Sequence, residues 1–215
     1  MALSFDAMII DPGRVITAFE PNDFVHRIVG DHHRAISVRR AVFGSPSWKL
    51  IDQGLITETD AEARIVAENP ELADAIHDVF SHYKEFLIAI PEGVEILERT
   101  RHSGLRAYGI ANVGADAWDS MTRRFGFIRL FNGFVVSFQE KLLNPDPAIF
   151  EKLIARYAIE PKRCLFTADE PRSVEAARHF GFDGIHFTNH RQLTESLEAR
   201  GIFQFHSAAP AVSHA

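Results

Sequence analysis

An apolar run that ends in an aspartate limits the possible folds of this chain more than any other stretch. Residues 7–10 read Ala-Met-Ile-Ile, which has the length and β-branched content of a fully buried strand. Asp11 follows at once, and Pro12-Gly13 is a turn signal. Ligands of open α/β sheets bind outside the carboxyl ends of the strands, so Asp11 is a candidate reactive group. A strand that ends in an Asx-type turn explains the same residues without any chemistry.

Beyond Pro91 the pattern alternates between strands and helices, which is typical of a parallel sheet with right-handed crossovers and helices on both faces. Strands are predicted at 105–111, 133–138, 164–168 and 184–187, and helices at 92–102, 116–125, 146–157, 172–180 and 192–200. Apolar residues between positions 20 and 90 follow helical spacing instead, and this block has no clear strand pattern. We therefore expect an α/β fold with a Rossmann-like parallel core and an inserted all-helical unit of four or five helices.

The expected boundaries follow from these patterns. The core comprises residues 1–16 plus 91–206, the helical insertion comprises residues 17–90, and the small, polar tail at 207–215 is predicted to be disordered. A chain of 215 residues suits one sizeable core with such an insertion.

Charge limits the classes of partner, and the cysteine content and N-terminus bear on the cellular compartment. The net charge of -6 argues against nucleic acid or an anionic membrane as a general partner, and no apolar run approaches a membrane span. A single cysteine, Cys164, permits no internal disulfide, and the N-terminus shows no secretory signal. We expect a cytoplasmic protein, and the sequence identifies no protein partner.

Four segments fall at the carboxyl ends of predicted strands, where an α/β protein places its functional groups. They are 11–13, 110–112, 141–147 and 167–170. Together with three further stretches they resemble the haloacid dehalogenase (HAD) superfamily over roughly residues 5–203. The stretches that carry the resemblance most specifically are Asn-Pro-Asp-Pro-Ala-Ile-Phe at 144–150, the run at 173–188, and Trp-Lys-Leu-Ile-Asp-Gln-Gly at 48–54. The chain is most similar to the phosphatase-like subfamily that has a helical C1-type cap and an Asp-x-Gly first motif.

The resemblance implies phosphoryl transfer through an aspartyl-phosphate, with Asp11 as the nucleophile. It also implies Mg²⁺ as cofactor, held by the Asp11 carboxylate, the Gly13 backbone carbonyl and Asp169. The implied substrate is a small phosphorylated metabolite.

Several positions depart from the family's motifs. Ala111 stands where the second motif has Ser or Thr, although Asn112 after it is retained. Asn144 replaces the Lys of the third motif, and Ala168 replaces the first acid of the fourth. One preorganised donor aimed at developing charge is worth on the order of 10²–10³ in rate, so these losses predict weak or altered activity.

A cation from elsewhere could compensate for the missing lysine. Lys141 lies three residues before Asn144, and Arg14 follows Gly13 directly. The simpler interpretation of either side chain is a solvated charge. The substrate-binding candidates are therefore Ala111, Asn112, Asn144 and Lys141.

Three functions remain open on this sequence. The first is a weak or altered Mg²⁺-dependent phosphatase that uses Asp11 and Asp169. The second is a catalytically silent HAD relative, a pseudoenzyme that binds a metabolite or a protein, which Ala111, Asn144 and Ala168 favour. The third is a dehalogenase-like hydrolase, which in the family also relies on the missing lysine and hydroxyl. Fold-level analogy does not supply the substrate.

Overall fold

The computed structural model describes residues 5–203, so the predicted tail at 207–215 lies outside the described residues. Within 5–203, no helix is long and apolar enough to cross a bilayer.

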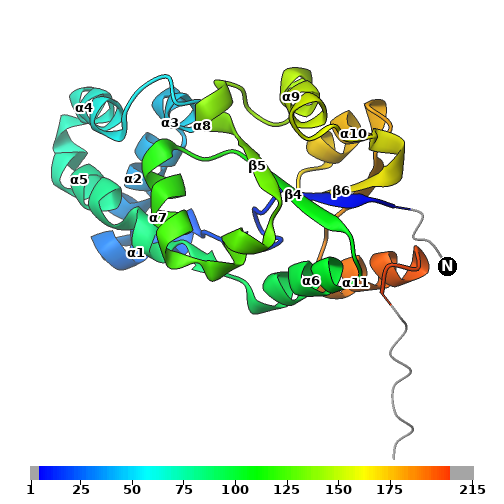
Figure 1. Cartoon of the computed structure of the whole chain (residues 1–215). Helices are drawn as coiled ribbons and strands as arrows, with labels where there is room; N and C mark the ends of the chain where they lie inside the picture. Colours follow the sequence, from blue (N-terminus) through cyan, green and yellow to red (C-terminus); the bar gives the residue numbers. More distant parts are fainter. Residues whose placement is uncertain (1–4, 204–215) are drawn as a thin grey trace, which may run out of the picture.

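A five-stranded parallel sheet forms the centre of the protein (Figure 1). Its strands are β1 (Ala7–Ile10), β4 (Arg106–Ala111), β5 (Gly133–Val136), β6 (Cys164–Ala168) and β7 (Asp183–His186). The spatial order is β5-β4-β1-β6-β7, and each neighbouring pair is parallel. The strand that was expected to lead to Asp11 is therefore the middle one, and the expected α/β class is confirmed.

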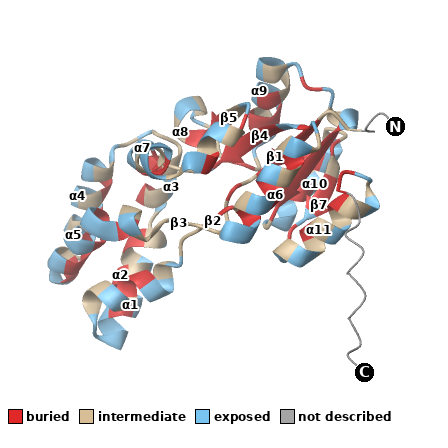
Figure 2. Cartoon of the chain, turned by 60° about the horizontal axis from the view of Figure 1, so that its bottom comes forward, coloured by how far each residue is buried: buried red, intermediate tan, exposed pale blue. Residues whose placement is uncertain are grey.

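Helices cover both faces of this sheet because the buried strands alternate apolar side chains between the two sides. Met8 and Ile10 pack in one apolar cluster, and Ala7 and Ile9 pack in another. The first cluster includes residues of α6 (Pro91–His102) and α11 (His190–Ala199), and the second includes residues of α9 (Pro147–Tyr157) and α10 (Pro171–His179). The strands are correspondingly buried (Figure 2).

A helical segment at residues 21–86, called the cap below, stands beside this core (Figures 1 and 2). It contains α1 (Pro21–Val29), α2 (His32–Phe43), α3 (Pro46–Asp52), α4 (Glu58–Glu68) and α5 (Ala73–His82), with 3-10 turns at Pro70–Leu72 and Tyr83–Phe86. Short antiparallel strands, β2 (Thr17–Ala18) and β3 (Ile88–Ala89), pair where the chain enters and leaves the cap. The cap has an apolar core of its own.

Local signals in the sequence place the cap helices. Thr57 and Asp60 form a reciprocal capping box at the start of α4, and Asn69-Pro70 ends that helix. The last helical segment of the cap is divided, because α5 ends at His82 and a 3-10 turn follows.

The remaining elements lie between strands of the core. They are α7 (Ala115–Arg124), α8 (Ser137–Glu140) and 3-10 turns at Gly126–Leu130 and Pro161–Arg163. The strand predicted at 133–138 ends at Val136, and α8 begins at Ser137. The fully buried Ser137 hydroxyl lies 2.5 Å from the Asp52 carbonyl of the cap, to which it donates, and accepts from the Val113 N–H at 2.9 Å. Tertiary contacts of this kind override the apolar pattern that predicted a longer strand.

Two further contacts hold the cap against the core. Lys141 Nζ donates to the Gly54 carbonyl, and the Arg124 guanidinium donates to backbone carbonyls of residues 84, 85 and 87. Gly54 has a φ of +64°, and a Cβ added there would come within 2.4 Å of the Phe138 carbonyl oxygen. The end of α3 therefore sits directly on the core, where a larger residue would not fit.

Candidate active site

Asp11 lies one residue beyond the middle strand of the sheet. Its N–H donates to the Thr167 carbonyl at 2.9 Å, so the backbone of Asp11 still belongs to the ladder with β6. Its carboxyl Oδ1 accepts from the Gly13 N–H at 3.2 Å, which is the Asx-type turn expected from the sequence. This turn is compatible with reactivity, because it fixes the orientation of the carboxyl group at the sheet's carboxyl edge.

An asparagine from another loop holds the other carboxyl oxygen, and a second asparagine positions the first. Asn144 Nδ2 donates to Asp11 Oδ2 at 2.9 Å. Asn144 is in turn positioned by Asn112, whose side chain accepts from the Asn144 N–H and donates to the Asn144 carbonyl, each at 2.8 Å. The structure thus brings together Asp11, Asn112 and Asn144, which sequence reasoning had placed at three strand ends.

The surroundings of the Asp11 carboxyl shift its pKa upward, which favours the protonated form. Burial raises its pKa to about 7, the hydrogen bonds from Gly13 and Asn144 lower it, and the negative charge of Asp169 raises it further. Asn144 supplies a dipole where a lysine would supply a full charge, and neutral hydrogen bonds are roughly half as strong as charge-assisted ones. The Oδ1 atom of Asn144 is buried and has no hydrogen-bond partner in the described structure.

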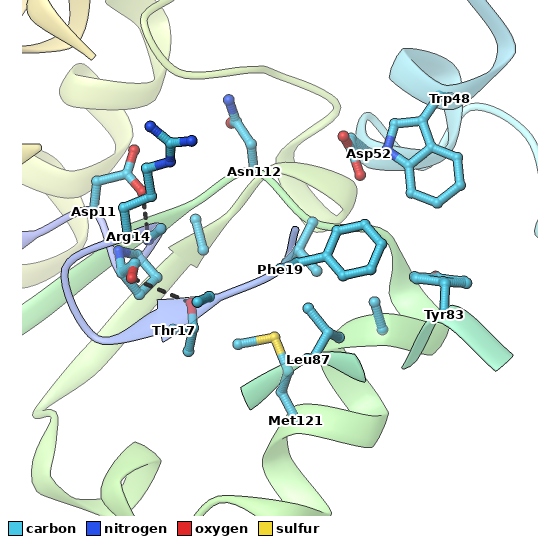
Figure 3. Close-up of a pocket in the computed structure, with 16 residues that line it drawn as sticks. Asp11, Arg14, Thr17, Phe19, Trp48, Asp52, Tyr83, Leu87, Asn112 and Met121 are labelled. Atoms are coloured by element: carbon cyan, nitrogen blue, oxygen red, sulfur yellow. Dashed lines mark hydrogen bonds between the residues drawn. The ribbon is translucent and has the colours of Figure 1, made fainter. Parts of the chain in front are cut away.

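Arg14 brings a positive charge to this group. Its Nε lies 3.8 Å from Asp169 Oδ2, and one of its terminal nitrogens lies 3.9 Å from Glu20 Oε1. The backbone of Arg14 has a φ of +57°, an uncommon conformation for a residue other than glycine. Figure 3 shows its side chain beside Asp11. Such backbone conformations cluster at functional sites.

The other candidates from the sequence are placed as follows. Ala111 and Gly13 line the same cavity as Asp11, and the Gly13 carbonyl accepts from the Val15 N–H at 2.6 Å. Lys141 lies elsewhere: it bonds to Gly54 and lines a separate cavity. Arg14, rather than Lys141, is therefore the cation beside Asp11.

A cavity of about 260 Å³ extends from Asp11 between core and cap (Figure 3). Five residues without a functional role in the sequence analysis line this cavity: Phe19, Asp52, Tyr83, Leu87 and Met121. Their convergence depends on long-range packing, so no local pattern marked them.

Two residues of α3 form part of this cavity wall. Trp48 packs within the cap, where its ring lies 4.5 Å from that of Phe43 and 5.2 Å from that of Tyr83, measured between centroids. Asp52 comes from the same helix. Burial raises the pKa of Asp52 to about 7, the Gly114 N–H lowers it, and Glu58 raises it. Asp11 and Asp52 are thus two carboxyl groups in separate electrostatic environments of one cavity.

Comparison with protein families gives a match over most of the chain. Residues 5–187 match the family described as haloacid dehalogenase-like hydrolase. A sesquiterpene phosphatase of Aspergillus oryzae is 21% identical over 200 residues, which cover 93% of this chain and 97% of that protein.

Solved structures of similar fold include two enzymes with bound ligands. A HAD family enzyme of Bacteroides thetaiotaomicron, in complex with magnesium and inorganic phosphate, has a TM-score of 0.69 and 17% identity, with 86% of this chain and 94% of that one covered. An L-2-haloacid dehalogenase of Xanthobacter autotrophicus, with chloropropionic acid covalently bound, has a TM-score of 0.59 and 15% identity, with 93% and 84% covered. These likenesses establish the fold.

Proposed function

The chain belongs to the haloacid dehalogenase-like hydrolase family, and from this membership we propose that it is a phosphatase acting on a small phosphate monoester through Asp11. The observation that carries the proposal is the Asp11 carboxyl at the edge of the cavity, with both oxygens oriented by hydrogen bonds. The phosphatase name of the fungal relative supports the same reaction class.

The chemistry follows from the position of Asp11. One carboxylate oxygen attacks phosphorus, the bond from phosphorus to the ester oxygen breaks, and the leaving alkoxide takes a proton from water. A second water then attacks phosphorus, releases phosphate and restores the carboxylate. Gly13 stands where a general acid would act, so this chain offers no side chain there, and we expect slow turnover with poor leaving groups.

Arg14 and the asparagines take the remaining roles. The Arg14 guanidinium lies where it can bind phosphoryl oxygens, because it lines the cavity beside Asp11. Asn144 keeps one Asp11 oxygen fixed, and Asn112 keeps Asn144 in place. A donor at the phosphoryl oxygens, the role given to Arg14, stabilises charge that develops in the transition state, whereas the Asn144 hydrogen bond orients the nucleophile.

Mg²⁺ fits the oxygen donors of this site. The negative charge of Asp169 raises the pKa of Asp11, so the two carboxylates repel each other, and a divalent cation between them would relieve that repulsion. Asp11, Asp169 and the Gly13 carbonyl would hold it, with Mg²⁺ supplying neutralisation of phosphate charge. Within residues 5–203, no cluster of three or more Asp, Glu, His or Cys side chains is available to a metal, so the ion would depend on backbone oxygen and water for its other ligands.

The test is hydrolysis of an aryl phosphate and a panel of sugar phosphates, with and without Mg²⁺. Asp11→Asn, purified in parallel, controls for contaminating phosphatase. We expect Mg²⁺-dependent turnover that Asp11→Asn abolishes and Asp169→Ala reduces. Equal phosphate release from wild type and Asp11→Asn would overturn the proposal and favour a silent binding protein. Asn144→Lys combined with Ala111→Ser would then test whether activity is restored.

A further inference from the structure

The cavity beyond Asp11 is lined mainly by apolar side chains from both core and cap. Phe19, Trp48 and Leu87 lie on the cap side or on its connections, and Val113 and Met121 lie on the core side. In Figure 3, Asp11 and Asp52 lie on opposite sides of the cavity, Phe19 lies between them, and Leu87 and Met121 lie below Phe19. A ligand whose phosphate reaches Asp11 therefore has its organic group against this apolar wall.

The hydroxyl groups of the wall are already engaged. Thr17 Oγ1 donates to the Pro12 carbonyl at 3.2 Å, and the Tyr83 hydroxyl donates to Glu58. Neither donor is free for a substrate hydroxyl. Apart from the Asp52 carboxyl, a sugar bound in this cavity would find few partners to replace its hydrogen bonds to water, which a site of this kind penalises.

The positive charge of the cavity lies at the Asp11 side, whereas the Asp52 carboxyl lies on the opposite side. Arg14 is the cation among the described residues that line this cavity, and Asn112 lies on the same side (Figure 3). The cavity's volume of about 260 Å³ exceeds the roughly 150 Å³ of an apolar cavity that accommodates benzene. Since the 260 Å³ includes the polar space at Asp11, the cavity has room for one phosphate and a hydrocarbon group of about the size of one ring.

We propose that the substrate is the monophosphate of an apolar alcohol, with its phosphate at Asp11 and Arg14 and its hydrocarbon against Phe19, Leu87 and Met121. The inference rests on the proposed phosphatase function and specifies the substrate class. Asp52 and Trp48 bound the apolar stretch on the side away from Asp11, so they limit the length of hydrocarbon that the site accepts.

The first test measures kcat/KM for straight-chain alkyl phosphates from ethyl to octyl, with glucose 6-phosphate and glycerol 3-phosphate as polar comparators. Burial of each methylene group predicts a rise of roughly fourfold in kcat/KM until the cavity is full, followed by a plateau or a fall. The polar esters should be poorer than the alkyl ester of similar size. A flat series, or a preference for the polar esters, would overturn the inference.

A pair of adjacent residues gives a matched control. Leu87 lines the cavity, whereas its neighbour Ile88 is 55% exposed and lies outside that wall. Leu87→Asn should lower the octyl-to-ethyl ratio of kcat/KM by about tenfold or more, since it places an amide against the chain. Ile88→Asn should leave the ratio unchanged. Equal octyl-to-ethyl ratios in the two variants would show that the hydrocarbon chain does not contact Leu87.

Binding of non-hydrolysable alkyl phosphonates separates this inference from the proposed function. Trp118→Phe leaves Trp48 as the single tryptophan and a fluorescence reporter on the cavity wall. Octylphosphonate should bind more tightly than ethylphosphonate and change Trp48 emission. Tight, chain-length-dependent binding without any Asp11-dependent turnover would refute phosphatase activity alone. Asp11-dependent turnover of an aryl phosphate with no chain-length effect would refute the substrate class alone.

Discussion

The Asp52 carboxyl predicts a pH-dependent loss of stability that one substitution should remove. Burial, opposed by the Gly114 N–H, and the charge of Glu58 raise the pKa of Asp52 from 3.8 to about 7. The folded protein therefore keeps a proton on Asp52 after the unfolded chain has lost it. Stability falls as the pH rises from about 4 to about 7 and then levels off.

The size of this effect follows from the two pKa values. Each pKa unit corresponds to about 1.4 kcal/mol, so the full cost of ionising Asp52 in the folded protein is at most about 4 kcal/mol. Between pH 5 and pH 8 the cost that remains to appear is about 2–3 kcal/mol. Asp52→Asn keeps an oxygen that can accept from the Gly114 N–H, but it has no charge to desolvate.

Urea unfolding of wild type and Asp52→Asn at pH 5 and pH 8 measures the difference directly. We expect the variant to gain about 2–3 kcal/mol relative to wild type between the two pH values. Any pH-independent effect of the substitution, and the titration of Asp11, cancel in this comparison. Asp74→Asn, which removes a charge from an exposed position of the cap, controls for net charge. A stability difference that is the same at both pH values would refute the reasoning.

Three other substitutions test packing, cap closure and catalysis. Gly93→Ala should lower the free energy of unfolding by at least about 1–3 kcal/mol, measured in urea, because its Cβ would lie 1.9 Å from the Val15 carbonyl oxygen. Ser137→Ala should cost about 1–3 kcal/mol in the same assay, since it leaves the backbone groups that it joins, including the Asp52 carbonyl, without their partner. Arg14→Gln should lower kcat/KM for an aryl phosphate by about 10²–10³, with little change in unfolding, because that side chain is exposed.

Each of these variants has a matched control. Gly126→Ala introduces a Cβ with no atom within 4 Å, and Ser37→Ala removes an exposed hydroxyl that bonds within its own helix. Arg40→Gln removes an exposed arginine on α2. If a test variant and its control change the measured stability or kcat/KM by the same amount, the role assigned to the test residue is wrong.

The sequence predicted the elements whose signals are local. The apolar run before Asp11 indicated the buried strand, and the helical spacing of apolar residues between positions 20 and 90 indicated helices; both are present. The strand predicted through Phe138 was too long, because the Ser137 hydroxyl bonds to groups distant in the chain. A residue pattern contains no information about such a partner.

The candidate site also has a part that the sequence predicts and a part that only the structure shows. Asp11, Asn112 and Asn144 were expected near one another because parallel strands share an edge, and their hydrogen bonds join them. The choice between Arg14 and Lys141 needed three-dimensional coordinates, since both are flexible cations close in sequence to motif residues. The cavity wall was also beyond the sequence, because cap and core contribute to it together.

The end of α3 has a consequence for how ligands leave. The carbonyls of Asp52 and Gly54 accept the hydrogen bonds of Ser137 and Lys141, while the Asp52 side chain forms one wall of the cavity. Separating the cap from the core therefore dismantles the wall in the same movement. If the cap opens during ligand release, the α3 contacts break in the same step, and we then expect variants such as Ser137→Ala to shorten ligand residence time. Ligand release would then depend on contacts on the opposite side of the cavity from Asp11.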